Sequence, residues 1–498
     1  MYIQPTTNIR LLKDVPLDTT YDHTIYFESA TAQYNYFIGL QKYNLTNYTY
    51  QRVKRGVARV GIKADNLYDC NYMMFQNTAY GNKWFYAFIT AVEFVNNECA
   101  EIYFELDVMQ TWLFDYQLKE TFIERMTTPT DNVGDWIQPE NVDLGDYVTS
   151  YETTTNLFNS YSVLIMTADV DDNNPPSGMW GGLYNGVRYI AGLADTEEQI
   201  NLLNDYLVAL VKANMTDAVV SIIYVPTAML PSEPGTPKVY TAEIDKHISE
   251  LGGYIPKNKK LLTYPYNFLM VSNNQGNFST YKYERFTTTS EGKMVFTVAT
   301  QCSANPSIGL FAQGYKGEIA DYDNTLFISS FPQCSFAYDT YRAWVAQGGG
   351  ITTALSLVGA GASIASGNVA GGILGAGATI SNLVQVMNAP DQLKGSVGGN
   401  WYIANKFIDY RFMQRHILPQ YAKIIDDYFS KYGYAYNQFG TINRDSRPHW
   451  NYVKTRDIFI CGNLPSSDAS LIASIYNKGI TWWKNGNEVG QYNLDNTV

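Results

Sequence analysis

The feature that most limits how this chain can fold is a long stretch without charge. Residues 343–390, between Arg342 and Asp391, contain no Asp, Glu, Lys or Arg, and most of them are Gly, Ala, Ser or Thr. Such small side chains cannot build an ordinary packed core, yet the aliphatic residues among them are unfavourable to leave in water. The stretch divides near Gly367 and Asn368 into two pieces. Each piece is close to the length that crosses about 30 Å of hydrocarbon as a helix.

Two interpretations of this stretch are open: a hairpin that enters a membrane conditionally, and a buried or disordered apolar plug. A flexible linker is ordinarily polar, whereas here aliphatic residues recur throughout. The spacing of Gly367, Gly371 and Gly375 is typical of helices that pack closely in lipid. Asn382 and Gln385 make permanent insertion marginal. We expect a conditional inserter whose membrane-active residues are Ile351, Leu355, Leu357, Val358, Ile364, Gly367, Gly371, Ile373, Leu374, Gly375, Ile380, Leu383 and Val384.

The overall composition favours a β-rich protein with large subunit contacts. The 498 residues include 41 Tyr and 23 Phe, and tyrosine suits half-buried strands and wet interfaces. The net charge of −12 argues against a protein that binds nucleic acid tightly, because phosphate binding depends on Lys and Arg. It does not argue against a protein through which nucleic acid passes without binding. The five cysteines are scattered and form no CxxC, so we expect free thiols. The N-terminal residues show no secretory signal.

From about His23 to Met126 the pattern predicts strands, with a turn at residues 80–82. Alternation is clearest around residues 101–108, where Glu101, Glu105 and Asp107 fall on one face of the predicted strand. Carboxylates at this spacing could serve a glycosidase or hold a metal. The favoured interpretation is a solvated or channel-facing side of a sheet, and we expect these three residues to line a lumen.

Further along, the sequence predicts an α/β lobe and a C-terminal α+β portion. Apolar strands at 162–168 and 218–225 flank a helix that begins at Asp195. Pro419 begins a second helix that ends at Gly433, and a third covers 466–477. The predicted parts are 1–150, a β portion; 151–260, an inserted α/β lobe; 261–345, a β segment; 346–399, the apolar loop; and 400–498, a C-terminal α+β portion.

No motif in the sequence points to catalysis. Residues 169–173 imitate the start of a calcium loop, but Asn174 and Trp180 occupy the positions where glycine and glutamate are needed. There is no phosphate-binding P-loop, no GxSxG and no HExxH. We therefore expect no enzymatic activity, no cofactor and no metal.

Several long aromatic motifs resemble those of the distal tail tube, or tail knob, proteins of Picovirinae-type podophages. The resemblance is strongest over about 70–126 and 400–485. The motifs that carry it are NYMMFQN (71–77), YGNKWFYAF (80–88), FELDVMQTW (104–112), KYGY (431–434), NYVKTRD (451–457) and GITW (479–482). Over residues of about 150–300 the resemblance is only general and no specific motif carries it, and the chain is shorter there than its relatives.

The resemblance implies a mainly β protein whose tube domains close into a homohexameric ring at the tip of a short tail. In that family each subunit contributes an apolar loop, here 346–399, that plugs the lumen and later helps to form a pore in the host membrane. The implied partners are other tail proteins, the host membrane and double-stranded DNA that passes without specific binding. The implied location is the virion tail, assembled in the host cytoplasm.

Two other functions remain open on the sequence: a receptor-binding adhesin, which exposed tyrosines would suit, and a cell-wall hydrolase. Neither explains the uncharged stretch. The sequence therefore favours a structural tail subunit.

Overall fold

The computed structural model describes most of the chain, in two compact units. The described residues are 6–48, 56–78, 81–167, 180–184, 187–193, 219–230, 238–287, 292–301, 306–329, 331, 333–334 and 408–498, with single positions or pairs between 198 and 213. Unit 1 comprises 1–145, 253–262 and 418–498, and unit 2 comprises 146–252 and 263–417. The membrane-active residues predicted between 351 and 384 and the calcium-loop imitation at 169–173 lie outside the described residues.

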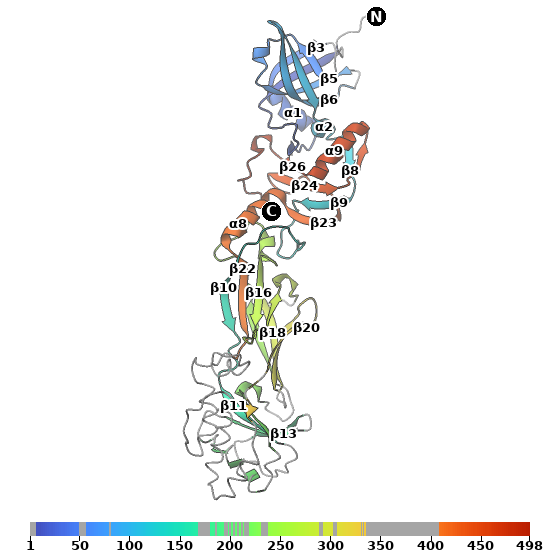
Figure 1. Cartoon of the computed structure of the whole chain (residues 1–498). Helices are drawn as coiled ribbons and strands as arrows, with labels where there is room; N and C mark the ends of the chain where they lie inside the picture. Colours follow the sequence, from blue (N-terminus) through green and yellow to red (C-terminus); the bar gives the residue numbers. More distant parts are fainter. Residues whose placement is uncertain are drawn as a thin grey trace. The chain divides into compact units, whose positions relative to one another are not determined.

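The N-terminal part of unit 1 is a curved antiparallel sheet of six strands in the order β3-β1-β5-β6-β7-β4 (Figure 1). The predicted turn at residues 80–82 lies between β5 and β6, where Gly81 and Asn82 both have positive φ. Cys70 and Cys99 are free thiols, as predicted, and so is Cys461 elsewhere in the unit. The strands are β1 (Thr7–Lys13), β3 (Gln41–Tyr48), β4 (Val57–Val60), β5 (Cys70–Asn77), β6 (Trp84–Asn96) and β7 (Cys99–Leu106).

Helix α1 (Ala30–Gly39) corrects the prediction of strands throughout His23 to Met126. The Ser29 hydroxyl accepts a hydrogen bond from the Ala32 amide and so begins the helix. Gln33 and Phe37, one turn apart, are both buried. The Phe37 ring stacks on Tyr72 of β5 with centroids 5.3 Å apart. Burial against the sheet therefore outweighs the strand preference of the aromatic residues in this segment.

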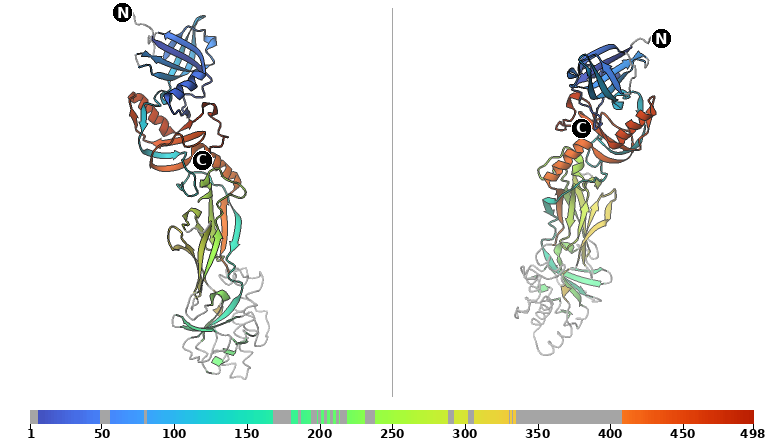
Figure 2. Two further views of the ribbon diagram at one scale, coloured as in Figure 1. Left: turned by 180° about the vertical axis from the view of Figure 1, so that it is seen from behind. Right: turned by 45° about the horizontal axis from the view of Figure 1, so that its top comes forward.

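The C-terminal part of unit 1 is a five-stranded sheet in the order β2-β26-β24-β9-β23, with helices beside it (Figure 2). Trp450, Trp482 and Trp483 are fully buried there. Its strands are β2 (His23–Ile25), β9 (Thr121–Met126), β23 (Tyr434–Gly440), β24 (Trp450–Arg456) and β26 (Ile480–Trp483), and β8 (Tyr116–Leu118) pairs separately with β25 (Ile460–Gly462). The helices are α2 (Val108–Thr111), α8 (Pro419–Tyr432) and α9 (Ser466–Lys478), with short 3₁₀ turns η1 (Ala64–Asn66), η5 (Lys259–Leu262) and η7 (Gly486–Glu488).

Helices α8 and α9 confirm the two C-terminal helices that the sequence predicts. Pro419 is the first residue of α8, and Gly433 follows its last residue with φ +66°. Gly479 follows α9 with φ +103°. Among the described residues no helix is long and apolar enough to cross a membrane.

A buried ion cluster joins three stretches of unit 1 that are far apart in sequence. The Glu140 carboxylate is fully buried and accepts from the Lys260 ammonium at 2.6 Å, from the Ala435 amide at 2.7 Å and from the Arg125 guanidinium. Arg125 also donates to the carbonyl oxygen of Gly433 at 2.5 Å. Burial lowers the pKa of Lys260 despite its carboxylate partner. A buried charge whose partners were removed would be strongly destabilising, so these stretches depend on one another.

Asp426 of α8 forms a second buried anchor for residues 253–262. Its carboxylate accepts hydrogen bonds from the Tyr254 hydroxyl at 2.7 Å and from the backbone amides of Lys257 and Asn258 at 2.7 and 2.9 Å. The side-chain amide of Asn258 bonds to Asp426 and to Ser430 of the same helix. Residues 254–258 are thereby fixed along α8.

Unit 2 is built from antiparallel sheets around one hydrophobic cluster. The first sheet contains β10 (Tyr147–Thr154), β22 (Arg411–Ile417), β16 (Asn267–Ser272) and β17 (Phe278–Tyr281), and the second contains β15 (Lys238–Asp245), β18 (Lys293–Gln301), β19 (Ser307–Gln313) and β20 (Ala320–Ile328). The third contains β12 (Trp180–Tyr184), β13 (Val187–Leu193), β11 (Tyr161–Thr167), β14 (Val219–Pro226) and β21 (Gln333–Cys334), and the 3₁₀ turns are η4 (Thr227–Met229) and η6 (Tyr283–Arg285).

The predicted fold class, mainly β with antiparallel sheets, is confirmed. The apolar strands predicted at 162–168 and 218–225 are β11 and β14, and they pair directly with each other. Described positions between 198 and 210 are helical, in agreement with the helix predicted from Asp195.

Replacement of Gly433 by Ala should destabilise unit 1 much more than replacement of Gly490. Both glycines have positive φ, +66° and +86°, which disfavours any other residue by about 1–2 kcal/mol. At Gly433 an added Cβ would also lie 2.1 Å from the carbonyl oxygen of Met126, whereas at Gly490 it would meet open space. We expect a loss of roughly 3 kcal/mol or more for Gly433→Ala.

Urea unfolding followed by tryptophan fluorescence measures this difference, because six of the nine tryptophans belong to unit 1. Equal losses in the two variants would show that the close approach to Met126 has no energetic weight.

Candidate assembly surface

The acidic residues predicted to line a lumen do not share one environment. Glu105 is exposed on β7, opposite Phe88 of β6. Glu101 pairs across the strands with Arg59 of β4. Asp107 is only 1% exposed, because β7 ends at Leu106 and the chain turns inward into α2. The prediction that Asp107 lines a lumen is therefore wrong, and for Glu101 and Glu105 it stays a prediction.

Asp107 is instead the N-cap of the buried helix α2. Its carboxylate accepts from the amides of Met109 and Gln110 at 3.0 and 3.1 Å, and from the Tyr72 hydroxyl at 2.7 Å. Burial raises the pKa of Asp107 to about 6, although these hydrogen bonds oppose the rise. An Asp directly before a short apolar run is an N-cap signal. Asp107 also continues the period-two alternation of β7, and for that reason the sequence pattern assigns it to the strand.

The raised pKa of Asp107 predicts a definite pH dependence of stability. Between about pH 4 and pH 6 the folded chain holds a proton on Asp107 that the unfolded chain has lost, so the unfolding free energy falls as pH rises. The shift corresponds to about 3 kcal/mol at most. Asp107→Asn keeps an oxygen acceptor for the two amides and places its NH2 group beside the Tyr72 hydroxyl oxygen, which can accept from it, but it cannot titrate.

We expect the wild-type chain to gain stability relative to Asp107→Asn when the pH is lowered from 7 to 4.5. Chemical denaturation of both proteins at the two pH values measures this difference, in which contributions of the other carboxyl groups cancel. Parallel pH profiles would contradict the buried, titrating Asp107.

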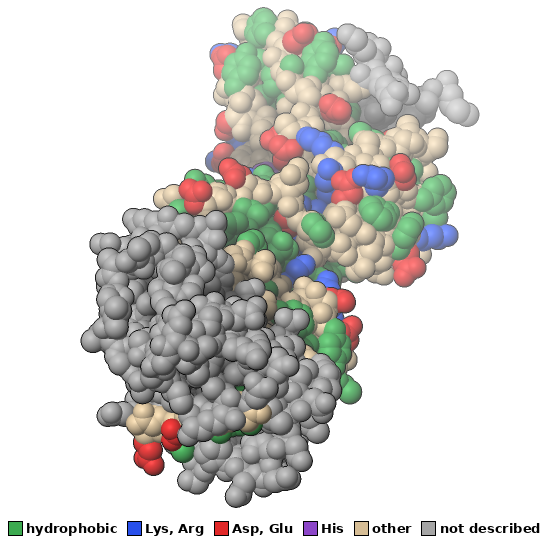
Figure 3. All heavy atoms as spheres, turned by 60° about the horizontal axis from the view of Figure 1, so that its bottom comes forward, with side chains coloured by type: hydrophobic (Ala, Val, Ile, Leu, Met, Phe, Trp, Pro, Cys, Tyr) green, Lys and Arg blue, Asp and Glu red, His purple; other side chains and the backbone are tan. Residues whose placement is uncertain are grey.

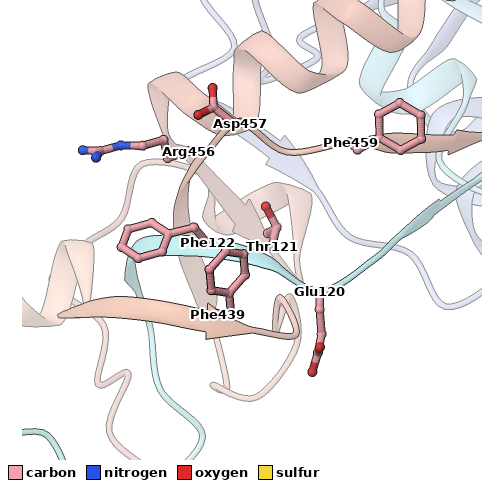
Figure 4. A pocket seen from close by; sticks show the side chains of 7 residues that line it. All are labelled: Glu120, Thr121, Phe122, Phe439, Arg456, Asp457 and Phe459. Carbon is pink, nitrogen blue, oxygen red and sulfur yellow. The ribbon is translucent and has the colours of Figure 1, made fainter.

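A hollow lined by aromatic rings lies at one edge of the C-terminal sheet of unit 1 (Figure 4). We call it the aromatic hollow. It has a volume of about 430 Å³. Phe439 and Phe459 are 73% and 71% exposed. The residues that line it are Glu120, Thr121, Phe122, Phe439, Arg456, Asp457 and Phe459.

Neighbouring strands position these rings. Phe439 of the edge strand β23 lies opposite Phe122 of β9, and the two rings meet edge to face with centroids 5.7 Å apart. Arg456 of β24 lies over Phe122 at 5.8 Å and donates to Glu124 at 2.7 and 3.0 Å. Its charge is therefore already balanced.

A bulge shapes the free edge of β23. The pairing register shifts between Ala435 and Gln438, and Asn437 has φ +48°. Such bulges bend an edge strand and hinder the addition of another strand. The bulge therefore favours contacts made by side chains at this edge over strand addition.

The hollow combines exposed aromatic rings with charged side chains. Figure 3 shows hydrophobic side chains scattered among charged ones on the described part of the face in view, which is ordinary for a protein surface. The aromatic hollow differs because three phenylalanines gather around one depression with a polar rim, as in protein–protein contacts. In the described part of the chain no group of three or more His, Cys, Asp or Glu could hold a metal ion.

Sequence reasoning missed the aromatic hollow. Its three phenylalanines come from segments around 122, 439 and 459, and each alone is an ordinary strand or loop residue. Only the pairing of β9 with β23 brings Phe122 and Phe439 together.

The fold is that of a phage tail knob protein. The tail knob protein gp12 of bacteriophage C1 superposes with a TM-score of 0.64 over 97% of each chain, at 15% sequence identity. Residues 5–117 match the N-terminal domain of caudoviral major tail proteins. Residues 234–497, more than half of the chain, match the C-terminal domain of the tail knob protein gp9 of Bacillus phage phi29.

The chain belongs to the family of the phi29 tail knob protein gp9. It is 25% identical to that protein over 99% of this chain and 98% of the relative. The tail knob proteins of Bacillus phages PZA and B103 are each 24% identical with the same coverage. The resemblance to podophage tail knob proteins is confirmed. The alignment with phi29 gp9 runs over 600 positions, so the relative carries residues that this 498-residue chain lacks.

Proposed function

We propose that this protein is a homohexameric tail knob subunit that forms the conduit for genome ejection, and that its apolar loop first plugs the lumen and then penetrates the host membrane. The observation that carries the proposal is the uncharged stretch 343–390 inside a chain that matches tail knob proteins over almost its whole length. Its location is the virion tail, assembled in the host cytoplasm, with other tail proteins as partners.

The charge of the chain suits a conduit for DNA. A net charge of −12 opposes adhesion of phosphates to the walls of a tube. Glu101 and Glu105 are the residues of the first sheet that we propose to approach the lumen. Double-stranded DNA then passes without specific binding, and the protein contributes no catalysis and no cofactor.

The apolar loop has two favourable environments. Exposed apolar area is unfavourable by about 25 cal/mol per Å², so ten aliphatic side chains in water correspond to roughly 15 kcal/mol or more. A plugged lumen hides this area, and lipid hides it equally well if the backbone is helical. Displacement of the plug therefore drives the loop towards a membrane.

Deletion of residues 350–388 should abolish dye release from liposomes without preventing assembly. Gly371→Asp with Leu374→Asp should strongly reduce dye release, because each charge at mid-bilayer costs roughly 2.5–3.5 kcal/mol on insertion scales. Gly371→Ala with Leu374→Met is the matched uncharged control and should retain release. Electron micrographs of each variant show whether the ring forms.

Undiminished leakage from both the deletion and the double aspartate variant would mean that the loop is only a plug. A wild-type chain that stays monomeric at micromolar concentration would refute the proposal of a hexameric conduit.

A further inference from the structure

A second exposed surface of unit 1 is complementary to the aromatic hollow in charge and character. Ile255 and Ile424 are 73% and 67% exposed. Lys257, Lys259 and Lys423 beside them in sequence are exposed as well. We call these five residues the basic ridge. Asp426, through its bonds to Tyr254 and to the Lys257 amide, holds the two segments of the ridge together.

Some charges of the two surfaces interact within their own copy: Arg456 pairs with Glu124, and Lys257 and Lys259 lie near the carboxylates of Asp495 and Asp131. Within the described part of the chain, Lys257 and Lys423 form no ion pair, and neither do Glu120 and Asp457 on the rim of the hollow. Lys119 precedes Glu120 but does not line the hollow. The rim thus presents two carboxylates without an ion pair beside exposed rings, and the ridge presents exposed ammonium groups beside exposed isoleucines.

The two surfaces lie at opposite ends of one continuous segment. Helix α8 carries Ile424 in its first half and leads through Gly433 into β23, which carries Phe439 near its end. The helical part between these residues is about 12 Å long and the strand part about 17 Å. In Figures 1 and 2 the helix and the strand extend to opposite sides of unit 1. The ridge and the hollow are therefore carried by elements on different sides of unit 1.

We propose that the aromatic hollow of one copy receives the basic ridge of the next copy, so that this contact links neighbouring subunits of the ring. The inference rests on the hexamer proposed above and specifies its interface. Ile255 and Ile424 pack against Phe439 and Phe459, while lysines meet the carboxylates of Glu120 and Asp457. Two different surfaces of the same chain form a heterologous contact, which is the type that closes rings. The bulge in β23 disfavours pairing by strand addition.

Charge reversal on each side of the contact provides a sharp test on the full-length chain. The hollow variant is Glu120→Lys with Asp457→Lys, and the ridge variant is Lys257→Glu with Lys423→Glu. Each variant alone brings like charges together and should assemble at least tenfold more weakly, as measured by sedimentation velocity at several concentrations. An equimolar mixture should assemble again, because every hollow then finds a ridge of opposite charge and an even-numbered ring closes by alternation.

Glu28→Lys with Glu98→Lys is the matched control, since it reverses two exposed acidic residues of unit 1 outside both surfaces. It should assemble like the wild type. Normal assembly of either variant alone, failure of the mixture to recover, or an equal loss in the control would overturn this interface. If the wild type forms rings in those cases, the proposed function stands and only the interface is wrong. A monomeric wild type would instead refute the ring itself.

Discussion

The buried carboxylates of Glu140 and Asp426 are the constraint on which unit 1 depends. Unit 1 is assembled from three separate stretches, and the middle one, residues 253–262, is too short to supply a core of its own. Glu140 binds Lys260 of that stretch, and Asp426 binds its backbone amides. Polar groups buried this deeply are unfavourable unless every one is paired, so the network accepts one arrangement of the three stretches.

The same network fixes the two surfaces that we propose to meet between copies. Asp426 orders residues 254–258 along α8 and thus builds the basic ridge. At the other end of the helix Arg125 bonds to the Gly433 carbonyl oxygen, and Glu140 bonds to the Ala435 amide at the start of β23. Because this network ties the ridge to α8 and α8 to β23, the two surfaces keep a fixed relation within each copy, which ring closure requires.

Local signals in the sequence predicted much of this fold. Pro419 and Gly433 delimited α8, and alternation identified the strand β7. Prediction failed where contacts distant in sequence decide the structure. Helix α1 depends on the stacking of Phe37 on Tyr72, and the inward position of Asp107 depends on the burial of α2. The aromatic hollow requires the register of β9 with β23, which no periodicity in either strand contains.

The acidity of the chain makes local charge complementarity necessary for assembly. Copies that each carry −12 repel one another at a distance, but salt screens that repulsion beyond about 8–10 Å. Contacts closer than this depend on the few charges at the interface. Several exposed lysines and arginines of unit 1 already form ion pairs within their own copy, as Arg456 does with Glu124 and Lys42 with Asp69. Lys423 forms no ion pair in the described part of the chain and Lys257 is exposed, so both can meet a neighbour, and an acidic rim beside exposed phenylalanines is the surface that suits them.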